Sequence, residues 1–125
     1  MRYNIVAGEE LKHIMMGMID SPIPFNEDMS VGSYSSFPFS DAFINERSKV
    51  HHVEEELYRK KLESFLIVLS KLKKDDDIHL YFGIDKTCMA NKELLINYFK
   101  GKVHSIILHT VDELTGLEIE EPVVY

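Results

Sequence analysis

The sequence predicts an α/β domain in three layers, in which helices flank a small, mainly parallel sheet of about four strands in a flavodoxin-like or Rossmann-like plan. The clearest observation is the segment Ile78–Asp85, which is almost continuously apolar and rich in β-forming residues, as expected of a strand buried on both faces. One helical pattern precedes this segment and another follows it. Because parallel strands need a long crossover connection, usually a helix, this order predicts a parallel sheet.

Length and composition indicate one globular domain that spans residues 1–125. Apolar residues make up 45% of the chain and charged residues 28%, near the averages for soluble globular proteins, which opposes disorder. The formal charge of −7 opposes attraction to phosphate backbones and anionic lipid, so we expect neither nucleic acid nor a membrane as a partner. A single cysteine, the lack of a long apolar leader and the lack of any apolar run near ~20 residues predict a cytoplasmic protein.

The chain opens with a predicted strand over Tyr3–Ala7, a tight turn at Gly8 and an amphipathic helix. The helix prediction rests on i, i+3, i+4 and i+7 spacing of the apolar residues Leu11, Ile14, Met15 and Met18. Since methionine commonly fills gaps in cores, we expect Met15 and Met18 to be buried beneath this helix.

A proline-bearing segment and a polar loop come next. Pro22 and Pro24 exclude a regular central strand and leave an edge strand or an extended segment. A loop begins with the segment Asn26–Gly32, and this loop is rich in turn-forming residues. Five aromatic residues lie in or near this loop and offer too much apolar surface to leave in water, so we expect the loop to be ordered and packed against the domain. They are Phe25, Tyr34, Phe37, Phe39 and Phe43.

Two helices are predicted after the loop. Ser40 or Asp41 caps a short helix that runs to about Arg47. The longest helix is predicted over Val53–Lys73, with acids near its start and lysines near its end, where both complement the helix dipole. One face of this helix should pack on the sheet through the apolar stripe Leu57, Leu62, Phe65, Leu66, Leu69 and Leu72.

The last predicted elements are a helix and a strand. Thr87 suits the N-cap of a helix over Cys88–Phe99, and Gly101 suits the chain reversal that follows it. Val103–Thr110 contains an apolar run and is predicted as the next strand. Residues 111–125 carry acids, a glycine and a proline, and no structure is assigned to them.

Two glycines mark the expected functional edge of the sheet. Ligand sites in such sheets gather where strands end, so Gly8, Gly83 and Asp85 are candidate ligand-binding residues. Gly8 also fits a phosphate-binding turn before a helix. No glycine-rich phosphate motif is present, however, and Glu9 and Glu10 would repel an anion, so a plain turn is favoured.

Three blocks of the sequence resemble one bacterial protein family. They are Ile5–Gly8 followed by an amphipathic helix, Asp28–Gly32 with Arg47 downstream, and Leu80–Gly83 with Asp85. Together they are similar, over nearly the whole chain, to the family called domain of unknown function 1835. That family has no established activity, so the resemblance implies the fold and leaves the function open. It also implies that the candidate ligand-binding residues include Asp28, Ser30, Gly32 and Arg47.

The chain departs from the family pattern in three ways. Members typically carry Asp-Asp-x-Ser-x-Gly-Pro, whereas Glu27 replaces the first Asp here and Ser33 replaces the Pro. Many members have Gly-Asp-Ser in the first turn, whereas this chain has Gly8 followed by two glutamates. Longer members also carry an additional C-terminal domain, which we do not expect within these 125 residues.

The sequence predicts no metal site and no cofactor. His52 and Glu56 are four residues apart and share a helix face, but zinc needs three or four converging ligands. The other histidines are scattered over separate elements, so a solvated helix start is favoured for His51 and His52. Cys88 at a helix start fits a reactive thiol, but a small buried residue is favoured because free cysteine is commonly buried.

Two classes of function remain open. In the first, the domain binds a small molecule or nucleotide-like ligand at the C-terminal edge of the sheet. In the second, it is an interaction or regulatory module without enzymatic activity, whose acidic, aromatic surface contacts a protein partner or another copy. An enzyme ranks third, since Asp28, Ser30 and Arg47 offer an acid, a hydroxyl and an anion clamp in no recognised arrangement. We expect either that Arg47 pairs with Asp28 or holds an anionic ligand, or that Asp28 and Ser30 only cap a turn while Arg47 pairs with a surface acid.

Overall fold

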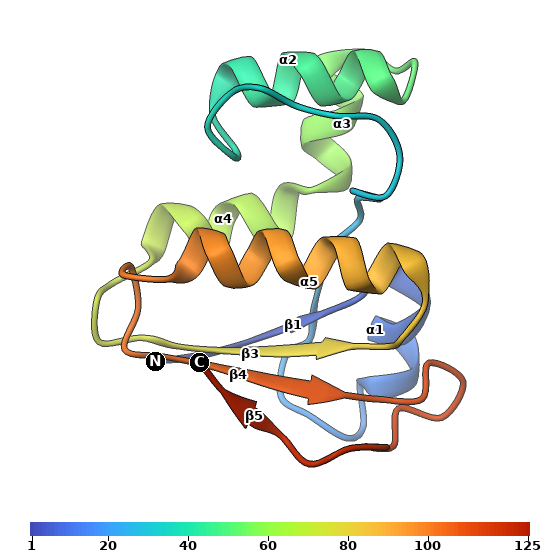
Figure 1. Cartoon of the computed structure of the whole chain (residues 1–125), viewed down its shortest axis with the longest axis vertical. Coiled ribbons are helices and arrows are strands. Elements are labelled where there is room, and N and C mark those ends of the chain that lie inside the picture. Colours follow the sequence, from blue (N-terminus) through green and yellow to red (C-terminus); the bar gives the residue numbers. More distant parts are fainter.

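The computed structural model describes all 125 residues and confirms the predicted α/β fold, with helices packed on a mainly parallel sheet (Figure 1). Its five strands lie in the order β2-β1-β3-β4-β5, in which the first four are parallel and β5 is antiparallel to β4. The order of the parallel strands is that of the flavodoxin-like plan. The strands are β1 (Arg2–Val6), β2 (Ile23–Pro24), β3 (Asp77–Phe82), β4 (Ser105–Thr110) and β5 (Val123–Val124).

The predicted buried strand is β3, which pairs with β1 on one side and β4 on the other. Its residues alternate between two covered faces, so five consecutive side chains from Ile78 to Phe82 are buried. The two-residue β2 lies at the edge next to β1, which is one of the two alternatives that Pro22 and Pro24 left open. The fifth strand, β5, comes from the tail to which no structure was assigned.

Five helices surround the sheet. They are α1 (Glu9–Met15), α2 (Asp41–Val50), α3 (Glu55–Lys61), α4 (Glu63–Lys71) and α5 (Lys86–Phe99). In Figure 1, α4 and α5 cover one face of the sheet, and α2 and α3 stand beyond them, on the side away from the sheet. None of these helices combines the length and the apolar character that a bilayer crossing requires.

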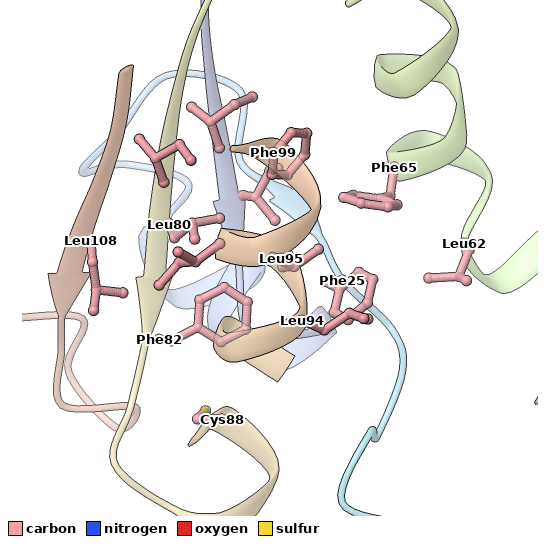
Figure 2. Packing of buried hydrophobic residues seen from close by; sticks show 14 of the residues in the cluster. Phe25, Leu62, Phe65, Leu80, Phe82, Cys88, Leu94, Leu95, Phe99 and Leu108 are labelled. Atoms are coloured by element: carbon pink, nitrogen blue, oxygen red, sulfur yellow. The ribbon is translucent and has the colours of Figure 1, made fainter. Parts of the chain in front are cut away.

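The main core lies between the sheet and the pair α4 and α5. Figure 2 shows Leu95 and Phe99 of α5 between Leu80 of β3 and Phe65 of α4, and all four side chains are fully buried. Phe25 packs edge-on against Phe65, with ring centroids 4.9 Å apart. The start of the loop is thereby fixed to the core, as its aromatic content predicted.

A smaller core lies under α1 on the opposite face of the sheet and completes the third layer. It contains Val6, Leu11, Met15, Tyr81 and Val111. The expected burial of Met18 is wrong, because α1 ends at Met15 and Met18 is 47% exposed in the turn beyond it.

The prediction of one long helix over residues 53–73 is also wrong. Leu62 has φ −97° and ψ 7°, and it separates α3 from α4. Leu62 is fully buried, whereas Leu57, which belonged to the predicted stripe, is 46% exposed. The break turns α3 away from the sheet and toward α2, so that Tyr58 of α3 reaches the polar cluster described below.

The helix starts follow the expected chemistry with one change. The Ser40 hydroxyl accepts a hydrogen bond from the Phe43 N–H at the start of α2, which extends to Val50, three residues beyond its predicted end. The prediction of Thr87 as a cap is wrong, because Asp85 caps α5 and its carboxylate accepts from the Cys88 N–H at 2.7 Å.

Candidate functional site

The parallel strands end at one edge of the sheet, and the candidate residues follow their last positions. Gly8 follows β1, Asn26–Asp28 follow β2, Gly83 and Asp85 follow β3, and Glu113 follows β4. Ligands of open α/β sheets bind at this edge, outside the carboxyl ends of the strands. The loops that carry the candidate residues therefore lie together at this edge of the sheet.

A buried ion pair holds the loop after β2. The Arg47 Nε donates to Glu27 Oε2 at 3.0 Å, and the Arg47 Nη2 donates to Glu27 Oε1 at 2.9 Å. Both side chains are fully buried. Burial alone would raise the pKa of the Glu27 carboxyl, but hydrogen bonds from Arg47 and Tyr58 outweigh it, so the pKa lies below its ordinary value.

Arg47 uses its remaining donors on the backbone of the loop. They bond the carbonyl oxygens of Asp28 at 2.8 Å, Val31 at 2.9 Å and Ser33 at 3.4 Å. All five N–H groups of the guanidinium therefore have partners within the chain. The predicted pairing of Arg47 with the Asp28 carboxylate is wrong, because the partner is Glu27. The guanidinium also holds the loop backbone in place through its carbonyl groups.

Three more side chains complete the cluster around Glu27. The Tyr58 hydroxyl donates to Glu27 Oε2, and burial followed by the adjacent carboxylate raises the pKa of Tyr58. His51 Nε2 lies 2.5 Å from Glu27 Oε1, so the expectation of a solvated His51 is wrong. Asn91 of α5 is fully buried and bonds both the Glu27 carbonyl and the Met29 N–H. This cluster joins α2, α3, α5 and the loop.

Within the loop, Asp28 forms a local turn. Its carboxylate accepts from the Ser30 N–H at 3.0 Å and from the Ser30 hydroxyl. Burial opposes ionisation of Asp28, but hydrogen bonds from Ser30 and then Thr87 outweigh it and lower the pKa of the carboxyl. At Gly32, where φ is +69°, an added Cβ would lie 2.6 Å from Val50 Cγ1, so the loop needs glycine there.

A pocket of about 410 Å³ opens beside this cluster, between the ends of β1 and β2 and the helices α2 and α3. Its polar lining comprises Gly8, Asn26, Glu27, Asp28, His51, Tyr58 and Lys61, and its apolar lining is Ala7, Phe25 and Val53. Of the residues predicted from sequence, Gly8 and Asp28 line this pocket. Ser30, Gly32 and Arg47 build the loop beside it, and Gly83 and Asp85 belong to a separate group.

That separate group consists of Asp85, Cys88 and Glu113, whose ligand-type atoms lie within 4.8 Å of one another. Burial raises the pKa of the Cys88 thiol, which keeps the sulfur protonated and is unlike a reactive cysteine. Burial and then the Asp85 carboxylate raise the pKa of Glu113, whereas the Cys88 N–H lowers that of Asp85. The nearby Asp85 carboxylate therefore disfavours ionisation of Glu113.

Two of the remaining histidines lie on separate elements, as expected, but the sheet brings them into contact. His79 of β3 and His109 of β4 lie side by side, with Nδ1 of His79 2.8 Å from Nε2 of His109. Nδ1 of His109 contacts Glu118 Oε1, and Tyr81 stacks on the His109 ring with centroids 4.3 Å apart. Parallel pairing of β3 and β4 brings these positions together, which the spacing in the sequence does not reveal.

An aromatic groove of about 420 Å³ lies between the loop and α5. Phe37, expected to be packed, is 64% exposed there, and Tyr34 is 40% exposed. The Lys102 ammonium lies 5.3 Å from the centroid of the Phe37 ring and 4.4 Å from that of Tyr98, so a cation bridges the two rings.

No protein-family model, no curated protein and no solved structure matches this chain.

Sequence reasoning missed Tyr58, Asn91 and the central role of Glu27. One signal was available for Glu27, because it directly precedes the motif at Asp28 and has an arginine downstream. Tyr58 and Asn91 lie on helices where their spacing does not distinguish a polar contact from ordinary packing. Only the fold brings them to the same carboxylate.

Proposed function

We propose that this domain binds a small polar molecule, such as a nucleotide-like ligand, in the pocket beside Glu27. The observation that carries the proposal is the position of the pocket: it lies at the carboxyl ends of parallel strands, next to a fully hydrogen-bonded buried ion pair. Ligand sites in open α/β sheets form at this edge. A rigid charged cluster of this kind supports a preorganised binding wall.

The lining supports a ligand with both polar and apolar parts. Ala7, Phe25 and Val53 offer an apolar surface, whereas Lys61 and Asp28 carry opposite charges. Small-molecule sites commonly combine an apolar surface with a few fixed polar groups. The volume, about 410 Å³, lies in the range of such sites.

The experiment is a thermal-shift screen against nucleotides, sugar phosphates and amino acids, followed by native mass spectrometry. We expect at least one compound to raise the melting temperature, because binding to the folded state alone stabilises it. A matched pair of variants localises the effect. Gly8→Leu places a side chain in the pocket without backbone strain, since φ is 174° and the nearest atom to an added Cβ is 4.0 Å away.

The control variant is Gly17→Leu, the same substitution where an added Cβ has no neighbour within 4 Å. The compound should lose its effect on Gly8→Leu and keep it on Gly17→Leu. If no compound binds, or if both variants respond as the wild type does, the proposal is wrong.

The second candidate function is a protein-interaction module without enzymatic activity, supported by the exposed Phe37 in the aromatic groove. Exposed aromatic side chains that border a groove are typical of interaction sites. A partner captured by the wild type and lost with Phe37→Ser, in the absence of any small ligand, favours this function. The matched control is Leu114→Ser, at an 87% exposed residue outside the groove.

We also infer membership of the family called domain of unknown function 1835, and a cytoplasmic location. The contacts of Arg47 with Asp28 and Val31 support the first inference, because they give a physical reason for a loop motif to accompany a distant arginine. Expression in a bacterial host with fractionation of the cells tests the second inference.

A further inference from the structure

One ring nitrogen of His51, Nε2, contacts both the Glu27 carboxylate and the Arg47 guanidinium. Nε2 lies 2.5 Å from Glu27 Oε1 and 3.3 Å from Arg47 Nη2. The closer partner accepts hydrogen bonds, and all five donors of Arg47 already have acceptors, so we assign a proton to Nε2. Nε2 then keeps its proton in both charge states of the ring, and Nδ1 is the atom that gains and loses one.

Nδ1 of His51 has no partner in the protein. No hydrogen bond of the chain includes this atom, and no buried side-chain nitrogen or oxygen lacks a partner, so Nδ1 is accessible. The side chain is 29% exposed and lines the pocket. His51 therefore lines the pocket with one ring nitrogen, Nδ1, unpaired, while its other nitrogen is anchored to a buried carboxylate.

The surroundings fix this imidazole in place. Tyr58 stacks beside the ring at an interplanar angle of 17° and holds the same carboxylate through its hydroxyl. The charged residues that line the pocket are Glu27, Asp28 and Lys61, and the charge of Glu27 is compensated by the buried Arg47. An imidazole held by a carboxylate has a fixed tautomer and orientation, which general-base catalysis requires.

We propose that His51 is a general base of this pocket, oriented by Glu27, and that it activates water, with hydrolysis of a small ester as the test reaction. In the step, Nδ1 takes a proton from water as the water oxygen bonds to the acyl carbon. The bond from that carbon to the leaving oxygen then breaks, and the imidazolium returns its proton to the leaving group. The Lys61 ammonium is the cation available to the oxyanion that forms between these events. This inference uses the pocket of the proposed function and adds a reaction to it.

The first measurement is the tautomer of His51 in the wild-type protein. Long-range ¹H–¹⁵N correlation spectra, recorded at a pH high enough for the ring to be neutral, report which nitrogen carries the proton. We expect the proton on Nε2. A proton on Nδ1 overturns the proposal, because the accessible nitrogen would then have no lone pair to offer. This measurement needs no variant and no ligand.

The second measurement is the hydrolysis of p-nitrophenyl acetate, used as the probe ester. His51→Gln retains an N–H donor near Glu27 but lacks the basic Nδ1, so we expect the protein-dependent rate to fall by about tenfold or more. The control is His52→Asn, because His52 is exposed and asparagine tolerates its φ of 56°. Circular dichroism and thermal melts confirm that each variant is folded.

Each outcome separates the two proposals. If a compound binds in the pocket but His51→Gln hydrolyses the probe as fast as the wild type, the binding function stands and the base is wrong. If hydrolysis depends on His51 while no compound of the panel binds, the base stands and the ligand class is wrong. A wild-type rate no higher than that of His51→Gln, or an equal loss in His52→Asn, overturns the assignment of His51.

Discussion

A Cβ atom at Gly83 would lie 2.5 Å from Oε2 of Glu113, closer than side-chain atoms tolerate. Gly83→Ala should therefore push Glu113 away from Asp85 and Cys88. Since Glu113 is an adaptable side chain, we expect a loss of only about 1 kcal/mol in the free energy of unfolding. The pKa of Glu113 should fall toward its ordinary value, because its burial and its contact with Asp85 both decrease.

Carboxyl titration by ¹³C NMR measures that pKa, and a urea melt measures the stability. The control is Gly17→Ala, where an added Cβ meets nothing within 4 Å. An unchanged Glu113 titration in Gly83→Ala would show that the two residues do not constrain each other.

Removal of Arg47 should be among the most destabilising changes in the protein. Arg47→Ala leaves the Glu27 carboxylate buried without its charged partner, which typically costs about 3–5 kcal/mol. The matched control is Arg59→Ala, because Arg59 pairs with Asp41 at the surface and should cost less than about 1 kcal/mol. Urea melts compare the two, and equal losses would contradict the structural role of the buried pair.

The pair His79 and His109 predicts a stability loss in mild acid. Burial, the charge of Arg2 and the neighbouring His109 lower the pKa of His79 from 6.5 to about 4. Between about pH 6.5 and about pH 4, His79 therefore binds a proton in the unfolded chain but not in the folded protein. The free energy of unfolding falls as the pH decreases through this range. His79→Gln should reduce this loss, whereas His13→Gln at an exposed site should not. Melts across that pH range test the difference.

Phe65 should be a centre of the aromatic core. It is fully buried and packs against Phe25, Phe39 and Phe99. Phe65→Ala should cost about 3–5 kcal/mol in denaturant melts, the usual range for removing a buried ring. Ile67→Ala, on the same helix but 45% exposed, should cost less than about 1 kcal/mol, and a similar loss at both sites would mean that α4 presents a different face to the sheet.

Removal of metal should leave the fold unchanged. Asp85, Cys88 and Glu113 converge, but zinc binds thiolate, and burial raises the pKa of the Cys88 thiol. We expect the melting temperature to be the same with and without chelator, and elemental analysis to find no stoichiometric zinc. A value near one zinc per chain would contradict this prediction, because a structural zinc contributes directly to folding.

Strands β1, β3 and β4 and the helices between them were predictable because they depend on local patterns, whereas β5 was not. The apolar run at Ile78–Phe82 and the apolar periodicity after Gly8 each follow from burial of one short segment. The break at Leu62 was not predictable in this way. No glycine or proline stands there and the apolar stripe runs through it, so the sequence carries no local signal for the turn that brings α3 against α2.

The candidate site was predictable in its loops and not in its contacts. Gly8 was located because strand ends leave a signal in the sequence, and Asp28 was located through the family that its loop resembles. The partner of Arg47 was misassigned because two adjacent acids, Glu27 and Asp28, look alike until burial selects one of them. His51 was assigned to solvent because charged residues surround it in the sequence. Its contact with Glu27, 24 positions away, depends on the fold.

Pro24 has a consequence for association between molecules. The Phe25 N–H bonds the Val6 carbonyl of β1, and successive strand residues face opposite ways, so the nitrogen of Pro24 faces the open side of β2. A proline nitrogen carries no hydrogen to donate, and β2 is only two residues long. A strand from another molecule therefore finds almost no template at this edge, which protects the sheet from edge-to-edge aggregation.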